Sequence, residues 1–253
     1  MLISISLLIV TFVSFYEDIK ISDYTLKKAP IVETLLKDEL RERIDSIATA
    51  SIKREMEKKL EESKTDSLPQ ILFIFGDSMT YNLALRLAEY AKMNGHEIYS
   101  VNWDSSNTKI WSEHETLSYY INKYHPTQIY VSLGSNELYY KDPQSRRPYI
   151  EKIIQMIDTI PFVWIGPPSL KMDNGLNDML EEICGPGRFF RTSGLELARR
   201  KDKIHPTKEA SSIWVDSIMR WTSHSAHPYV VDTPDDSIGR QNPNIVFLKA
   251  LNK

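Results

Sequence analysis

The fold of this chain is decided by residues 71–78, which read Ile-Leu-Phe-Ile-Phe-Gly-Asp-Ser. Five apolar residues in a row predict a buried strand, Gly76 and Asp77 predict a tight turn, and the amphipathic stretch that follows predicts a helix. In open α/β folds, such strand ends lie at the carboxyl edge of a parallel sheet, where ligands bind. Ser78 is therefore a candidate nucleophile, and its own N–H at the helix N-terminus is a candidate oxyanion donor. Asp and Ser are equally ordinary helix N-caps, so these three residues alone do not separate the two interpretations.

Beyond a break in the pattern at residues 63–69, apolar runs alternate with amphipathic helical patterns. Strands are expected at 71–75, 97–102, 128–133, 162–166 and, from a weaker pattern, 188–191. Helices are expected at 79–93, 112–124, 148–159, 176–183 and 208–221. With right-handed crossovers, this alternation predicts a three-layer α/β/α domain over residues 67–223, built on a central parallel sheet of about five strands as in flavodoxin-like folds.

Length, charge and cysteine content limit the classes of function. A chain of 253 residues has room for one substantial core. The net charge of −3 and the mixing of both signs along the chain give no basic footprint, so binding to nucleic acid is not expected. Cys184 is the single cysteine, which excludes an intrachain disulfide and a Cys-rich zinc site. The sequence has no Gly-rich phosphate loop, so a nucleotide-binding domain ranks last among the functions considered, and no cofactor is expected.

The N-terminus predicts a location outside the cytoplasm. Residues 1–16 are almost wholly apolar and carry no charged side chain, and the run ends at Glu17. This pattern is typical of a signal peptide or a short membrane anchor within residues 1–20. Because neither a basic leading region nor a small-x-small cleavage site stands out, an uncleaved signal anchor is favoured, and a membrane-anchored or secreted protein of the cell envelope is expected. The alternative is a buried strand or helix of the main core.

Residues 21–66 are expected to form a charged amphipathic helical segment. Between residues 31 and 64, apolar residues recur at helical spacing within a highly charged sequence. Such a helix is a membrane-proximal stalk, a dimerising coiled coil or a helix packed on the domain, with dimerisation less favoured. Residues 224–253 are expected to be a tail that wraps the domain or frays. Its histidines His224 and His227 have no carboxylate-rich cluster nearby, so no metal site is assigned.

A hydroxyl nucleophile needs a base to take its proton and a group to orient that base. Asp202 and His205 lie three positions apart in one short loop before the last expected helix, for which Thr207 is the expected N-cap. A carboxylate can reach an imidazole nitrogen across such a turn. Because the loop follows the last expected strand, it is expected at the same sheet edge as Ser78, and the three residues together form a candidate triad.

A third cluster, Gly134-Ser135-Asn136-Glu137, directly follows the expected strand at 128–133. Gly134 permits a tight turn with close backbone approach. The side-chain amide of Asn136 is then a candidate oxyanion donor, and losing such a donor typically costs about 10²–10³ in turnover. The alternative is that Ser135 and Asn136 only cap the next helix.

In order and spacing, these three clusters resemble the SGNH subgroup of the GDSL esterase and acyltransferase family, over about residues 70–222. The resemblance implies an SGNH hydrolase fold, with Ser78 as nucleophile, His205 as base and later acid, and Asp202 as the orienting carboxylate. It also implies an oxyanion hole made by the N–H of Ser78, the amide of Asn136 and a backbone N–H from a second block. The family has glycine in that block, whereas this chain has none, so Ser106 or its neighbour Asn107 is the expected counterpart.

These residues predict a serine esterase that hydrolyses or transfers an acyl group, with an O-acetyl ester on a carbohydrate or cell-envelope substrate as the expected case. Trp103 and Trp111 flank the second block and either offer a face to the substrate or belong to the core. The proline-stiffened loop 166–169, Gly-Pro-Pro-Ser, is expected to border the substrate cleft. The alternative function is a non-catalytic carbohydrate-binding or envelope scaffold module that retains the fold.

Overall fold

The computed structural model describes residues 19–21, 23–26, 43, 68–169, 174–224, 232–235, 237–239 and 241–251. The chain divides into two units, Met1–Glu62 and Ser63–Lys253. The anchor predicted at residues 1–20 lies outside the described residues except for its last two positions, Ile19 and Lys20. Almost all of the helix expected at 31–64 lies outside them too, and Arg43, the one residue of it that is described, is helical. No helix within the described ranges is long and apolar enough to cross a membrane.

The described part of the first unit is a pair of short strands. Strand β1, Ile19–Ile21, pairs antiparallel with β2, Tyr24–Leu26. Residues 21–26 were expected to begin a helical segment, and that expectation is wrong at this point. Alternating apolar and polar residues around Asp23 form a hairpin there instead, in keeping with the period of a strand.

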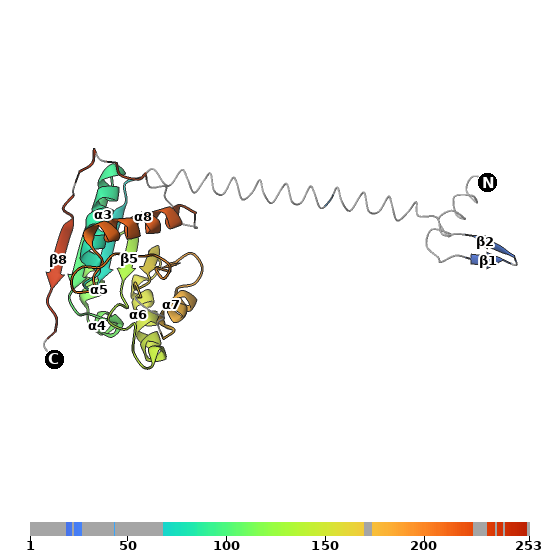
Figure 1. The fold of residues 1–253 in the computed structure, drawn as a ribbon, viewed down its shortest axis with the longest axis horizontal. Helices are drawn as coiled ribbons and strands as arrows, with labels where there is room; N and C mark the ends of the chain where they lie inside the picture. The colour runs from blue at the N-terminus through green and yellow to red at the C-terminus, as the bar shows by residue number, and fades with distance from the viewer. Residues whose placement is uncertain are drawn as a thin grey trace. The chain divides into compact units, whose positions relative to one another are not determined.

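The second unit is built on a six-stranded, all-parallel sheet (Figure 1). Its strand order is β7-β6-β5-β3-β4-β8. The strands are β3 (Ile71–Gly76), β4 (Glu97–Trp103), β5 (Gln128–Ser132), β6 (Phe162–Ile165), β7 (Phe189–Phe190) and β8 (Asn244–Leu248). The five predicted strands and the three-layer α/β/α architecture are confirmed.

The sixth strand, β8, was not predicted. It lies at the edge of the sheet beside β4, at the red end of the ribbon in Figure 1. Its register pairs Asn102 with Phe247 and Trp103 with Leu248. The apolar run at 245–251 was expected to belong to a tail, because the polar, proline-containing residues before it do not show the alternation of strands and helices. Its pairing partner β4 is far away in the sequence, so the apolar run alone did not place this segment in the sheet.

Helices cover both faces of the sheet (Figure 1). Helices α3 (Thr80–Met93) and α8 (Lys208–His224) pack on one face. The other face carries α4 (Thr108–Glu113), α5 (Thr116–Tyr124), α6 (Arg147–Ile157) and α7 (Leu176–Cys184), with a short 3₁₀ helix, Pro143–Arg146, before α6. Alternate residues of β3 enter the two layers, since Leu72 and Ile74 face α3 and α8 whereas Phe73 and Phe75 face the opposite helices.

The helix predicted at 112–124 is in fact two helices. The side chain of Asn107 caps α4 by accepting the Ile110 N–H at 3.0 Å, so helical structure starts earlier than predicted. His114 then adopts an extended conformation, with φ −101° and ψ 149°, and ends α4. The break redirects the chain into α5, and the amphipathic pattern alone did not reveal it because both helices bury apolar residues on the same side of the sheet.

Candidate active site

Close approach of two strands fixes the turn that carries Ser78. A Cβ atom on Gly76 would lie 1.9 Å from the Ser132 carbonyl oxygen, so only glycine fits at the end of β3. The N–H of Asp77 donates to that same oxygen at 3.0 Å and anchors the turn to the end of β5. Ser78 follows, partly buried, just before α3 begins. Its N–H donates to no residue in the described part of the chain, which leaves this group available as an oxyanion donor.

The loop before α8 brings Asp202 and His205 to Ser78. Nδ1 of His205 lies 3.0 Å from Oδ2 of Asp202, and Nε2 of His205 lies 2.9 Å from Oγ of Ser78. Thr207 caps α8 as predicted, because its Oγ1 accepts the Ala210 N–H at 3.2 Å. The three side chains named from the sequence therefore meet in one hydrogen-bonded line beyond the carboxyl ends of the strands.

The loop itself keeps the Asp202 carboxylate ionised. Oδ1 of Asp202 accepts the N–H of Ile204 at 2.8 Å and that of His205 at 2.9 Å. These two bonds, followed by the bond to the His205 ring, lower the pKa of Asp202 from 3.8 to about 2. An ionised Asp202 can only accept, so it favours a proton on Nδ1 of His205 and leaves Nε2 to accept the Ser78 hydroxyl.

The predicted oxyanion donors differ in what they contact. Nδ2 of Asn136 donates to the Ser106 carbonyl oxygen at 2.8 Å, which orients the amide and uses one of its two hydrogens. The N–H of Ser106, the predicted backbone donor, donates instead to the Trp103 carbonyl oxygen at 3.1 Å, in a turn where Ser105 has a left-handed φ of 57°. The N–H of the alternative, Asn107, makes no hydrogen bond to any described residue. In this arrangement Asn107, rather than Ser106, has the available backbone donor.

Trp103 and Trp111 belong to the core and offer no face to a substrate, since their exposed fractions are 4% and 0%. The indole N–H of Trp111 donates to Oγ of Ser106 at 2.9 Å, and that of Trp103 donates to the Lys249 carbonyl oxygen at 2.9 Å. The side chain of Ser106 thus points into the core beneath the site. The Trp111 indole is therefore bonded to the loop at Ser106, and the Trp103 indole is bonded to the backbone just after β8.

Asp77 is a fully buried carboxyl group that joins the Ser78 turn to the turn after β5. Its Oδ1 accepts the Met79 N–H at 3.0 Å, and its Oδ2 accepts the Ser135 N–H at 3.3 Å. Burial raises the pKa of Asp77 from 3.8 to about 7, although both backbone bonds oppose this rise. The carboxyl group therefore holds two of the motif turns together at a cost in desolvation.

Glu137 makes the corresponding link between the turn after β5 and the start of α4. Its Oε2 accepts the Thr108 N–H at 3.0 Å, and its Oε1 accepts the Thr108 hydroxyl at 2.7 Å. Burial raises the pKa of Glu137, while the bonds from Thr108 and the charge of Arg146, 3.7 Å away, oppose the rise. The loop that carries Asn136 is in this way fastened to the loop that carries Asn107.

The supporting roles of Asp77, Glu137 and Thr108 were not predicted from the sequence. A signal existed for the two acids, because each is an ionisable residue in a turn directly after an apolar strand. Thr108 gave no signal beyond its place at the start of a helix. Within the described residues, no group of three or more His, Cys, Asp or Glu side chains is arranged to hold a metal ion.

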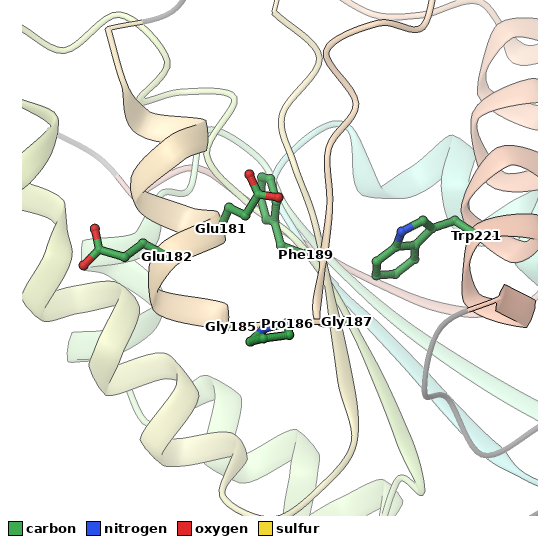
Figure 2. Close-up of a pocket in the computed structure, with 7 residues that line it drawn as sticks. All are labelled: Glu181, Glu182, Gly185, Pro186, Gly187, Phe189 and Trp221. Atoms are coloured by element: carbon green, nitrogen blue, oxygen red, sulfur yellow. The ribbon is translucent and has the colours of Figure 1, made fainter. Parts of the chain in front are cut away.

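Figure 2 shows a cavity whose lining includes none of these residues. It has a volume of about 580 Å³, and it is lined by Glu181, Glu182, Gly185, Pro186, Gly187, Phe189 and Trp221. Phe189 is the first residue of β7, so the cavity is at the amino end of that strand. Because all strands of the sheet are parallel, this is the edge opposite to Ser78, and the cavity is not the substrate site.

Comparisons with known proteins bear on the architecture. No protein-family model and no curated protein matches the chain. Among solved structures, the chain resembles "Crystal Structure of TesA" with a TM-score of 0.50 and 15% identity, over 60% of this chain and 97% of that one. The chain therefore shares the parallel α/β/α architecture of that structure. A second similar structure, "BT4096 a gut microbial diltiazem-metabolizing enzyme", has a TM-score of 0.47 and 12% identity, and the match covers 61% of this chain and 47% of that one.

Proposed function

We propose that this protein is a serine hydrolase that cleaves acyl esters through Ser78, His205 and Asp202. The observation that carries the proposal is the pair of distances in one line, 2.9 Å from Ser78 to His205 and 3.0 Å from His205 to Asp202. A hydroxyl becomes a nucleophile when a neighbouring base takes its proton and a carboxylate orients that base. The SGNH-type fold supports the proposal at the level of architecture.

In the first half of the proposed reaction, Oγ of Ser78 attacks the ester carbonyl carbon while Nε2 of His205 takes the hydroxyl proton. The carbonyl π electrons move to the oxygen, whose charge is stabilised by the N–H of Ser78 and the amide of Asn136, with the N–H of Asn107 as third donor. The carbonyl then re-forms, its bond to the alcohol oxygen breaks, and His205 gives its proton to the departing alkoxide. Asp202 balances the charge of the imidazolium in between.

In the second half, a water molecule attacks the acyl group on Ser78 while His205 takes one of its protons. The bond between the acyl carbon and Oγ breaks, and the proton returns to Oγ as the carboxylic acid leaves. If a sugar hydroxyl replaces the water, the same steps transfer the acyl group to that sugar.

The proposed substrate is an O-acetyl ester on a carbohydrate of the cell envelope. Support comes from the sequence, where residues 1–20 resemble a signal anchor or signal peptide and the Gly-Pro-Pro loop at 166–169 resembles a segment of SGNH proteins that act on envelope glycans. An extracytoplasmic location, membrane attachment through residues 1–20 and pairing of chains through residues 31–64 belong to the same proposal.

The test is hydrolysis of p-nitrophenyl acetate by the purified full chain, together with covalent labelling by a fluorophosphonate probe. Ser78→Ala is expected to remove the labelling and to lower turnover by at least about 10³-fold. Ser217→Ala is the matched control, because Ser217 is a partly buried α8 serine whose hydroxyl donates to the Ile213 carbonyl. Unchanged turnover in Ser78→Ala would refute the proposed mechanism.

A non-catalytic carbohydrate-binding or scaffold module is the second candidate. It is favoured by the Ser106 N–H, which donates to the Trp103 carbonyl in place of the glycine N–H that the family offers to an oxyanion. This candidate predicts that the wild-type chain binds acetylated glycans without hydrolysing them and that a fluorophosphonate does not label Ser78.

A further inference from the structure

The loop that carries Asp202 and His205 is a small hairpin. Its sides are joined by bonds from the Thr207 N–H to the Ala198 carbonyl and from the Arg200 N–H to the His205 carbonyl, both 2.8 Å long. At its tip the chain turns through Lys203, which has a left-handed φ of 60°. These bonds fix the shape of the hairpin, but they do not fix its position relative to Ser78, because all of them lie within the hairpin.

Arg199 connects this hairpin to the rest of the site. One terminal nitrogen of its guanidinium donates to the Ile204 carbonyl at 2.6 Å, directly before His205. The other donates to the Pro168 carbonyl at 3.0 Å, in the loop that follows β6. That second loop is itself held in the sheet, since the Gly166 N–H donates to the Phe190 carbonyl at 2.8 Å.

The surroundings of Arg199 indicate that these two carbonyl contacts are its main interactions. Among the described residues, its buried Nε has no hydrogen-bond partner, and no carboxylate lies within ion-pair distance of the guanidinium. Burial lowers the pKa of Arg199, against weaker opposing effects of Tyr139 and Asp202. A guanidinium kept in this place without an ion pair is best explained by its planar fork, which reaches two carbonyls in fixed directions.

We propose that Arg199 is a positioning residue for the base of the reaction: its guanidinium holds the backbone beside His205 at a set distance from the loop after β6, and so aligns the imidazole with Ser78. This positioning role rests on the proposed hydrolase function, whereas the contacts of Arg199 with the two carbonyls are independent of that function. Proline at 168 and proline at 206, the latter paired with Arg199 in an isolated bridge, stiffen both partners of the clamp.

The test compares Arg199→Met and Arg199→Lys with the wild-type full chain on p-nitrophenyl acetate. Arg199→Met is expected to lower kcat by about 10- to 100-fold while KM stays within about 3-fold, since a displaced base impairs the chemical step more than binding. Arg199→Lys keeps the charge but reaches one carbonyl, so an intermediate kcat is expected. The rate of fluorophosphonate labelling at Ser78 is expected to fall in parallel with kcat.

Arg86→Met is the matched control. Arg86 is a partly buried arginine that pairs with Asp216 and Glu89 between α3 and α8, away from the hairpin. This variant is expected to unfold at lower urea concentration while kcat per folded molecule stays unchanged. Arg199 has only a structural role if its variants lose kcat merely in proportion to the folded fraction, or if kcat stays within 2-fold of wild type.

Hydrogen exchange tests the clamp independently of activity. In Arg199→Met, amides of the peptide spanning residues 198–207 are expected to exchange at least about 10-fold faster, whereas in Arg86→Met they keep wild-type rates. Unchanged protection of this peptide would overturn the positioning role even if the protein proved to be a hydrolase. Conversely, absent esterase activity with faster exchange would refute the proposed function and leave the clamp as a binding-loop support.

Discussion

Titration of the buried Asp77 is expected to make the unfolding free energy fall as pH rises. The pKa of this carboxyl is about 7 in the folded protein and 3.8 ordinarily. Between these values the folded state holds a proton that the unfolded state has released, so raising the pH favours unfolding. A gap of about three pH units at about 1.36 kcal/mol each amounts to about 4 kcal/mol of unfolding free energy. This stabilisation is fully present below pH 3.8 and is lost by about pH 7.

The measurement is urea unfolding from pH 4.5 to 8.5, followed by tryptophan fluorescence. All five tryptophans lie in the unit Ser63–Lys253, so the signal reports on that unit alone. Glu137, whose pKa is also raised by burial, contributes a slope of the same sign. The lowered pKa of Asp202 acts below this range, because its stabilisation is complete above pH 4 and is lost only as pH falls toward 2.

Asp77→Asn isolates the contribution of Asp77. The amide cannot titrate and places an NH₂ group opposite the N–H of either Met79 or Ser135, so the variant is expected to be less stable than wild type at pH 5. This deficit is expected to shrink by about 3 kcal/mol by pH 8.5, because about two pH units separate pH 5 from the folded-state pKa of about 7 and only the wild-type carboxyl ionises across them. Parallel stability curves of the two proteins across this range would show that the Asp77 carboxyl does not titrate there, and the desolvation argument would be wrong.

Two further predictions concern backbone positions of the site. Gly76→Ala places a Cβ atom 1.9 Å from the Ser132 carbonyl oxygen, so the unfolding free energy is expected to fall by at least about 3 kcal/mol and esterase activity to be lost. Unfolding of this variant at the wild-type urea midpoint would contradict the prediction. Lys203 has a φ of 60°, so Lys203→Gly is expected to stabilise by up to about 1 kcal/mol and Lys203→Val to destabilise, and equal midpoints for the two variants would count against strain at this turn.

The parts of the fold that the sequence predicts are those specified by local pattern. Strands β3 to β6 are apolar runs next to amphipathic helices, and their alternation is enough to predict a parallel sheet. Strand β8 is also an apolar run, but it lies outside that alternation, and its partner β4 is more than a hundred positions earlier. The break at His114 and the burial of Trp103 likewise depend on contacts that no window of sequence contains.

The candidate site divides in the same way. Ser78, Asn136 and the pair Asp202 and His205 were found because each follows a predicted strand, and parallel strands end at one edge. The direction of a single N–H, by contrast, follows from the turn at Ser105, whose left-handed φ nothing in the sequence indicates. Spacing therefore predicts which loops meet, whereas the donors that these loops present depend on backbone conformation at individual residues.

The contacts between loops explain why the alignment of the site depends on residues outside the proposed triad. The Ser78 turn is joined to the turn after β5 by Asp77, that turn is joined to the start of α4 by Glu137, and the His205 hairpin is joined to the loop after β6 by Arg199. Each link is an ionisable side chain that bonds backbone groups of another loop. Such a bond needs no particular side chain in the partner, so the sequence reveals only one end of each link.

Burial of these ionisable groups is costly, and it is compensated only if all the loops are in place together. The line of hydrogen bonds from Ser78 to Asp202 is therefore a property of the assembled sheet edge, and substitutions at Asp77, Glu137 or Arg199 test that assembly more directly than substitutions at the proposed nucleophile.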